Sequence, residues 1–443
     1  MHAPNSRGLG GLLCHRAYLI ALISNTFSRF GDSIDHIAFS WMVYQLTGSH
    51  LLMGSVFAVS GLPSLLFGFA AGVLVDRLPK KTVVVFGHLA RALGVGLLLA
   101  LYALGALESW MIFVLAFLNS TAEVFAYPAH TGLIQRIVSR DSYLAANSLS
   151  QSSASVAELA GLCSSGIVLA AAGVAGALAL DAISFLAAAA GVSTVRIPFR
   201  EEESVEIEDA AESGAAVVVS ERKIGFLAEL KAGLAFVWGD RLLRITAFLA
   251  VFASLSLVPF EVLQPAFVKD VLGAGPAGMS VLGIGLAVGM ALGGIALARY
   301  GSGAKRLRLI LTGFLVVGVQ YACLALPGLF STISSRLAAA AVVAFFTGAG
   351  LPLVNATIGA YLMEKTPRRF IGRTTAVLNV AATGAVPLGA ALSGAAAEIV
   401  SIPVIFIALG AVLVGVALFA SSRPAVRKEL ASPRLLEAVR VPA

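Results

Sequence analysis

Long apolar segments alternate with short polar ones along almost the whole chain. About 20 apolar residues cross a bilayer as a helix, and segments of that length lie near residues 17–46, 50–75, 82–104, 110–134, 146–171 and 174–195. After a polar interval they recur near 243–268, 277–299, 307–327, 335–362, 374–398 and 401–421. The pattern predicts an all-α membrane protein with twelve transmembrane helices in two six-helix, pseudo-symmetric bundles.

The same pattern predicts how the chain is divided. We expect a six-helix bundle over 1–195, a cytoplasmic linker over 196–242, a second bundle over 243–421 and a cytoplasmic tail over 422–443. The linker begins with acidic residues that are typical of a solvated segment. Its second part, "GFLAELKAGLAFVW", predicts an amphipathic helix, either at the inner membrane interface or packed on the bundle.

Composition makes lipid the solvent of this chain. It is 58% hydrophobic and only 12% charged, whereas soluble domains carry about 25% charged residues. The formal net charge is +7, but the basic residues lie in short clusters between spans, so we expect no nucleic-acid partner. The three cysteines have no paired spacing, which indicates neither a disulfide framework nor a metal site. No cofactor is expected.

Basic residues also predict the orientation in the membrane. If both termini are cytoplasmic, the connections on that side hold nearly all Lys and Arg residues, and only Lys269 and Arg336 fall on the outer side. This bias follows the positive-inside rule. The first apolar span is too long for a signal peptide and carries charges. We therefore predict a multi-pass protein of the cell membrane with both termini inside.

Ionisable residues interrupt the first span. On a helix with about 100° per residue, one stripe within about 80° contains Asn25, Arg29, Asp32, His36 and Ser40, with Asp35 beside it. A charge at the bilayer centre costs about 2.5–3.5 kcal/mol on the most lenient scale. The stripe must therefore face a wet cavity or the protein interior.

Further polar residues lie within other spans: Arg91, Glu123, Glu158, Asp181, Glu261, Gln264, Asn355 and Asn379. Structural pairing is an alternative role for some of them. Arg29 with Asp32 and Asp32 with His36 have helical pair spacing, and Arg91 is a candidate partner for Glu123 or Glu158. Asp181 is interpreted as structural. We expect at least one of Asp32, Asp35, Glu123 and Glu158 to carry a transported proton.

The loop between the second and third spans reads Gly72-x-x-x-Asp76-Arg77-x-x-Lys80-Lys81. With twelve spans split six and six, it resembles the signature of the major facilitator superfamily. "GDSIDHIAFSWMVYQLTGS", "LALDAISFL" and "PRRFIGRTTAV" resemble the prokaryotic branch of macrolide-efflux proteins and siderophore exporters. Two departures are Pro79, where the signature usually has Gly, and "AELAGLCSSG", which lacks the proline of the antiporter motif.

The resemblance implies a fold and a mechanism. Spans one, four, seven and ten would surround a central cavity, which places Asp32, Glu123 and Glu261 around one volume. The loop would act as a conformational latch, with Asp76 near the positive end of a neighbouring helix and Arg77, Lys80 and Lys81 near inner-leaflet phosphates and helix C-termini. The latch would break when the cytoplasmic side opens.

These observations predict a monomeric secondary transporter that exports a small amphiphilic, drug-like or siderophore-like molecule by alternating access, with protons as the coupling ion. The alternatives are a facilitated importer or flippase-like carrier of a lipid or metabolite, a non-transporting receptor and an intramembrane enzyme. The chain has no HExxH, no GxSxG and no nucleotide-binding loop, which argues against an enzyme. Substrate identity, its charge and the direction of transport stay open.

Overall fold

The computed structural model describes residues 9–139, 142–196, 234–235, 237–239, 241–301, 305–366 and 371–431. Most of the expected linker, including Phe226 and Leu230 of its amphipathic helix, and the tail beyond Ala431 lie outside these residues. The helices are α1 (Leu9–Cys14), α2 (Arg16–Thr47), α3 (His50–Asp76), α4 (Lys80–Ala103), α5 (Ser109–Ile137), α6 (Tyr143–Thr194), α9 (Arg241–Ala266), α10 (Ala277–Tyr300), α11 (Arg306–Cys323), α12 (Ile333–Lys365), α13 (Ile371–Ile399), α14 (Ile402–Ser422) and α15 (Pro424–Ala431). A π-helix, Phe267–Val271, continues α9, and a 3₁₀ turn, Pro327–Leu329, follows α11.

The helices account for twelve spans. Among the described residues, nine helices are long and apolar enough to cross a membrane. One of these, α6, has 52 residues, about 78 Å at 1.5 Å per residue, which is more than twice the thickness of a bilayer core. It comprises two spans joined at Gly173, whose φ of +66° ends one helix before the next begins. The nine helices, with α6 counted as two spans, and the further helices α2 and α13 make twelve spans. The prediction of an all-α protein with twelve spans is confirmed.

Short connections join antiparallel neighbours. Gly48, at φ +67°, ends α2 by donating its backbone N–H to the Tyr44 carbonyl at 2.9 Å. The Ser49 side chain then accepts a hydrogen bond from the backbone N–H of Leu52 and caps α3. This tight turn places Tyr44, Ser49 and His50 together at one end of the molecule.

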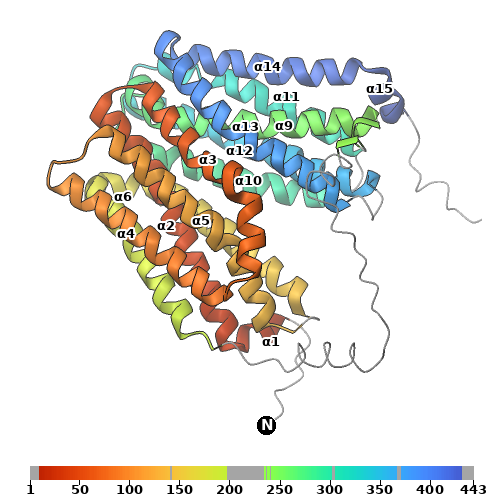
Figure 1. Cartoon of the computed structure of the whole chain (residues 1–443). Coiled ribbons are helices and arrows are strands. Elements are labelled where there is room, and N and C mark those ends of the chain that lie inside the picture. Colours follow the sequence, from red (N-terminus) through yellow and green to blue (C-terminus); the bar gives the residue numbers. More distant parts are fainter. Residues whose placement is uncertain are drawn as a thin grey trace, which may run out of the picture.

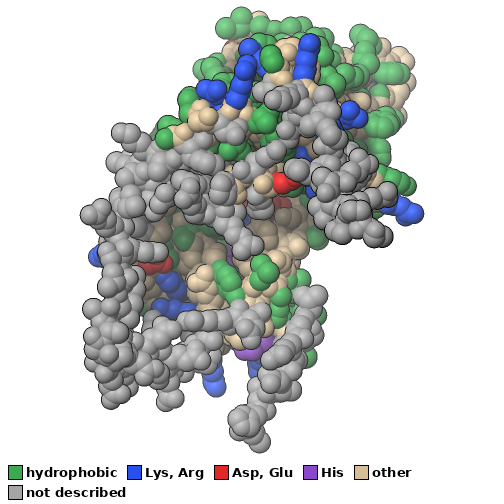
Figure 2. All heavy atoms as spheres, turned by 90° about the vertical axis from the view of Figure 1, so that its right-hand side faces the viewer, with side chains coloured by type: hydrophobic (Ala, Val, Ile, Leu, Met, Phe, Trp, Pro, Cys, Tyr) green, Lys and Arg blue, Asp and Glu red, His purple; other side chains and the backbone are tan. Residues whose placement is uncertain are grey.

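Helices α2–α6 form the N-terminal bundle and α9–α14 form the C-terminal bundle (Figure 1). The bundles contact each other mainly where α3 packs on α13 and α6 packs on α10. They meet at the end that carries the α2–α3 turn and diverge toward the end that carries α1 and α15 (Figure 1). Figure 2 looks onto the diverging end, where Lys and Arg side chains project from the surface.

Direct contacts close the meeting end. The Tyr44 hydroxyl donates a hydrogen bond to the Asp270 carboxylate, and the Lys269 ammonium lies 4.9 Å from the Tyr44 ring centroid. The Ser49 hydroxyl donates to Glu398 Oε1 at 2.7 Å. Every one of these contacts joins the N-terminal bundle to the C-terminal bundle.

A glycine pair brings α3 and α13 into backbone contact just below this end. A Cβ on Gly54 would lie 2.4 Å from the Ala390 carbonyl oxygen and 2.9 Å from Gly394 Cα. Both atoms belong to the backbone, so no side-chain movement relieves such an overlap. Only glycine allows the bundles to meet this closely here.

Gly54→Leu should therefore force α3 and α13 apart and open the meeting end. In a variant lacking Cys14, Cys163 and Cys323, a cysteine at Ser60 should react several-fold faster with a membrane-impermeant maleimide added from the side of the α2–α3 turn. Gly94→Leu is the matched control, since a Cβ there meets nothing within 4 Å. Equal labelling rates for Gly54→Leu and the parent would contradict this account of the closure.

Candidate functional site

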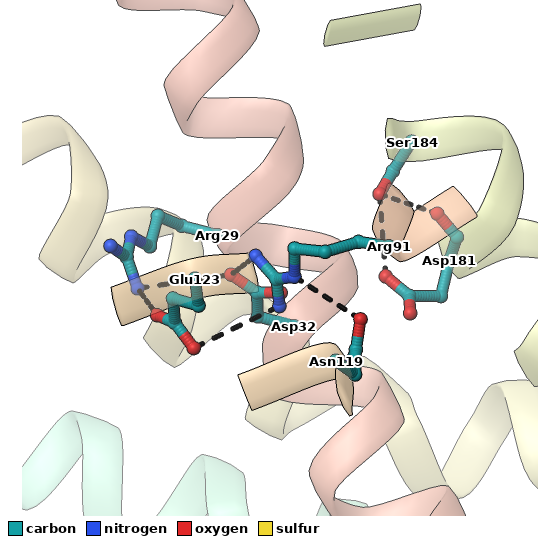
Figure 3. Close-up of polar contacts among 7 residues, drawn as sticks. All are labelled: Arg29, Asp32, Arg91, Asn119, Glu123, Asp181 and Ser184. Carbon is teal, nitrogen blue, oxygen red and sulfur yellow. Dashed lines mark hydrogen bonds and ion pairs between the residues drawn. The ribbon is translucent and has the colours of Figure 1, made fainter. Parts of the chain in front are cut away.

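A buried ion pair joins α4 to α2. Arg91 Nη2 contacts Asp32 Oδ1, Arg91 Nη1 lies 3.4 Å from Asp32 Oδ2, and Arg91 Nε donates to Asn119 Oδ1 of α5 at 3.3 Å (Figure 3). The guanidinium also lies over the Phe185 ring, with Cζ 4.1 Å from its centroid. Arg91 is 5% exposed and Asp32 is 7% exposed. One face of the guanidinium plane and its donors are thus used inside the N-terminal bundle.

A second pair extends this contact toward the bundle interface. Arg29 Nη1 of α2 donates to Glu123 Oε1 of α5 at 2.7 Å. Glu123 Oε2 also lies 3.9 Å from Arg91 Nη2, and Arg29 lies 3.8 Å from Asp32 Oδ2. We call Arg29, Asp32, Arg91, Asn119 and Glu123 the central network; Figure 3 shows their side chains converging from α2, α4 and α5.

The central network is dry at one end and wet at the other. The Glu123 side chain is 32% exposed, whereas that of Asp32 is 9% exposed and that of Arg91 is 6% exposed. Alternating pairs of opposite charge compensate the desolvation of each member. Of the two carboxylates of the central network, Glu123 is the one that solvent, a proton or a ligand reaches more readily.

Glu123 lines three adjoining hollows. The first also contains Asp32, Asp35, His36 and Ser60. The second lies within the N-terminal bundle and contains Asn25, Arg29 and Glu158. The third lies between the bundles, where Gly72 and Tyr127 face Glu261 of α9 and Val386 of α13.

The third hollow has about 1170 Å³ of open space including its mouth, which is the scale of a drug-sized ligand site.

The structure brings most of the residues singled out from the sequence to these hollows. Asp181, Gln264 and Asn355 do not line them: Asp181 and Gln264 are buried, at 0% and 3% exposure, and Asn355 is exposed. The Asn379 side chain lies outside the described residues. Arg91 pairs with Asp32 and, more distantly, with Glu123. The expected pairing of Asp32 with His36 is replaced by this contact, because Arg91 reaches Asp32 from the neighbouring helix α4.

Sequence reasoning missed several residues of the same face of α5. Asn119 precedes Glu123 by four residues, and Tyr127 and His130 follow it at helical spacing and line the second hollow beside it. Arg29 also lies over the Tyr127 ring, with Cζ 5.4 Å from its centroid. The signal was available as an i, i+4 series around one charged residue. Within the described residues, no three His, Cys, Asp or Glu side chains are grouped as metal ligands would be.

The loop after α3 places Lys80 at a helix C-terminus, which is one of the two positions expected for it. Lys80 is 7% exposed, and its ammonium donates to the Val75 carbonyl at 2.6 Å and to Asp76 Oδ1 at 3.0 Å. Its stem packs against Gly132 of α5, and its ammonium lies at the C-terminal end of α3. Asp76 is 83% exposed, Arg77 caps the end of α3, and Lys81 is partly exposed.

Two six-span bundles around an interfacial cavity define a membrane transporter with the major facilitator fold. The chain belongs to the family described as "Transmembrane secretion effector", which matches residues 12–435. It is a multi-pass membrane transporter and not an enzyme.

Relatives and solved structures agree with this class. The chain is 23% identical over 401 residues to macrolide efflux protein A of Streptococcus pyogenes, covering 90% of this chain and 94% of that one. It is 27% identical over 400 residues to the multidrug efflux pump Tap of Mycolicibacterium fortuitum, covering 88% and 91%. In fold it is similar to a nucleoside transporter NupG mutant, with a TM-score of 0.68 and 14% identity over 91% and 99% of the chains. It is also similar to a bacterial homologue of Spinster in an inward-facing and unoccupied conformation, with a TM-score of 0.65 and 14% identity, covering 95% of this chain and 99% of that one.

The Arg91–Asp32 contact should make each partner depend on the other. Asp32→Asn or Arg91→Gln leaves one buried charge unpaired, and breaking a buried pair costs about 3–5 kcal/mol. Both single variants should unfold at a clearly lower temperature in detergent, whereas the double variant should recover most of the loss. If the double variant is as unstable as the sum of the single variants, the contact is not a coupled pair.

Proposed function

We propose that the protein is a secondary active exporter of amphiphilic, drug-like molecules, driven by proton entry through alternating access. The efflux activities in the names of the two relatives support export and this substrate class. The charge bias of the connections supports a place in the cell membrane with both termini in the cytoplasm. We propose further that the unit of transport is a monomer, since each chain holds a complete cavity between its own bundles.

The position of Glu123 is the observation on which the proposal rests. It is an accessible carboxylate, bonded to Arg29 and shared by all three hollows. A proton on Glu123 would cancel its attraction to Arg29, and a substrate in the hollows would compete for the same groups. Proton and substrate would thus change one set of contacts, which is what exchange of one for the other requires.

The surfaces of the hollows favour an amphiphile. Phe57, Val124 and Pro128 give the third hollow an apolar wall, whereas Asn25, Asn147 and Gln151 give the second hollow hydrogen-bonding groups. The two hollows meet at Glu123 and Tyr127. A molecule with an apolar body and a polar substituent would fill both.

The conformation fits loading from the cytoplasm. The bundles are joined by direct contacts at the end that carries the α2–α3 turn and diverge at the basic end (Figures 1 and 2). If the basic end is cytoplasmic, this is an inward-facing state. A facilitated importer or lipid carrier would use the same cavity without a need for the charged central network.

Glu123→Gln should abolish gradient-driven transport, because it keeps the shape of the side chain but cannot exchange a proton. In inverted vesicles energised with an acidic lumen, the parent should accumulate a radiolabelled macrolide several-fold. The variant should not accumulate it, although it should still bind it.

Glu364→Gln is the matched control, since Glu364 is an exposed carboxylate 3.9 Å from Arg306, outside the hollows. It should transport like the parent. Accumulation by the parent that does not depend on the proton gradient would favour a facilitated carrier and contradict the coupling proposal.

The loop residues Gly72, Asp76, Arg77, Lys80 and Lys81 are proposed to act as a latch. In the inward-facing state Asp76 is exposed and bonded within its own loop, so the latch is released. Asp76→Asn should reduce transport at least several-fold while the thermal stability of the inward-facing protein stays close to that of the parent. Glu108→Gln, which alters a carboxylate in the α4–α5 turn, serves as the control. Normal transport by Asp76→Asn would exclude a latch role.

A further inference from the structure

We propose that Asp35 and Asp181 form a second proton-binding site, beside the central network in the contact between α2 and α6, in which both carboxyls are protonated in the conformation described. We call the two residues the rear pair. That both carboxyls carry a proton is argued from the structure alone, whereas the part of the site in transport rests on the proposed function.

Both carboxyls are buried without adequate partners. Asp35 is 4% exposed and Asp181 is 0% exposed. Among the described residues, Asp35 Oδ1 and Asp181 Oδ2 are fully buried and have no hydrogen-bond partner. Asp181 Oδ1 lies 3.4 Å from the Ser184 hydroxyl, whose main bond is to the Asp181 carbonyl at 2.8 Å. An ionised carboxylate needs several donors to replace its hydration, and this site does not supply them.

Close packing of α2 on α6 brings the two residues together. A Cβ on Gly31 would lie only 2.4 Å from Asp181 Oδ1 and 2.2 Å from Ser184 Oγ. Asp35 follows Gly31 by four residues, about 6 Å along the same face of α2, and its carboxyl lies within electrostatic range of that of Asp181. Glycine at position 31 thus makes room for the carboxyl of α6 directly against the backbone of α2.

The charge balance of this part of the bundle decides the protonation state. The other charged groups that act on the rear pair are Arg91 from α4, Asp32 from α2 and Glu123 from α5. Arg91 and Arg29 are the cations here, and they are already paired with Asp32 and Glu123. Two further ionised carboxylates would leave two uncompensated negative charges in a buried region. Protonation of the rear pair restores neutrality.

The site is connected to the cavity, and its protonation is coupled to the packing of α2 on α6. Asp35 lines the first hollow together with Asp32 and Glu123, whereas Asp181 lies behind it between α2 and α6. Loss of a proton would place negative charge in the tightest part of the α2–α6 contact. The protonated pair therefore favours the packing described here, and deprotonation favours a conformation in which water reaches this contact.

Infrared spectroscopy of the purified transporter at neutral pH tests the protonation state directly. The parent should show the carbonyl stretch of buried carboxylic acids. Asp181→Asn and Asp35→Asn should each lose part of this signal and keep a melting temperature close to the parent's, because Asn resembles the protonated acid in shape and hydrogen bonding. Glu123→Gln is the control and should leave the signal unchanged, since Glu123 is paired in its ionised form.

The proposal is overturned if Asp181→Asn leaves the acid signal unchanged, or if it is as unstable as Asp32→Asn or fails to fold, since an isostere of the protonated acid should be tolerated. A second measurement, proton release on addition of a macrolide in weakly buffered detergent, separates the two proposals. Release that is lost in Asp181→Asn but kept in Ser184→Ala supports a role of the rear pair in coupling. No release from the parent would count against the proposed function, while the infrared result would still decide the rear pair.

Discussion

Pairing of charge inside a bundle that lipid surrounds is the constraint on which the site depends. Arg91 cannot give up its charge, and its burial is tolerated because Asp32 of α2, Asn119 of α5 and the ring of Phe185 surround the guanidinium. This contact fixes α2, α4 and α5 relative to one another. The neighbouring Arg29–Glu123 pair then lies where the bundle faces the cavity. A dry pair positions the helices, and a wetter pair lies at the cavity.

The two ends of the molecule divide the mechanical roles. Contacts of Tyr44 and Ser49 with Asp270 and Glu398, and the backbone approach at Gly54, hold the bundles together at one end. At the other end Asp76 bonds within its own loop, to Lys80. Alternating access requires the contacts at each end to be weak enough to break and form again. A few polar contacts and close packing at glycine meet this requirement better than a large apolar interface.

The sequence was sufficient for the fold because burial in lipid demands long apolar helices, and their number can be read from hydropathy. It also placed the charged stripe of α2 on the cavity side, since a helix has one fixed period. The partners of those charges could not be read in this way. Arg91 reaches Asp32 from another helix, and the environment of Asp181 depends on a glycine 150 residues earlier, so both require the packing of helices that are distant in sequence. The burial of Lys80 could not be read from the loop for the same reason, because Gly132, against which its stem packs, belongs to α5.

The central claim is that substrate and protons exchange across one cavity. Proteoliposomes loaded with a macrolide and a pH-sensitive dye, with the membrane potential clamped by valinomycin and potassium, test it most directly. When the macrolide leaves down its gradient through the parent protein, the account predicts protons moving in the opposite direction and an acidified lumen. Macrolide movement at the same rate with no change in lumenal pH would contradict the account.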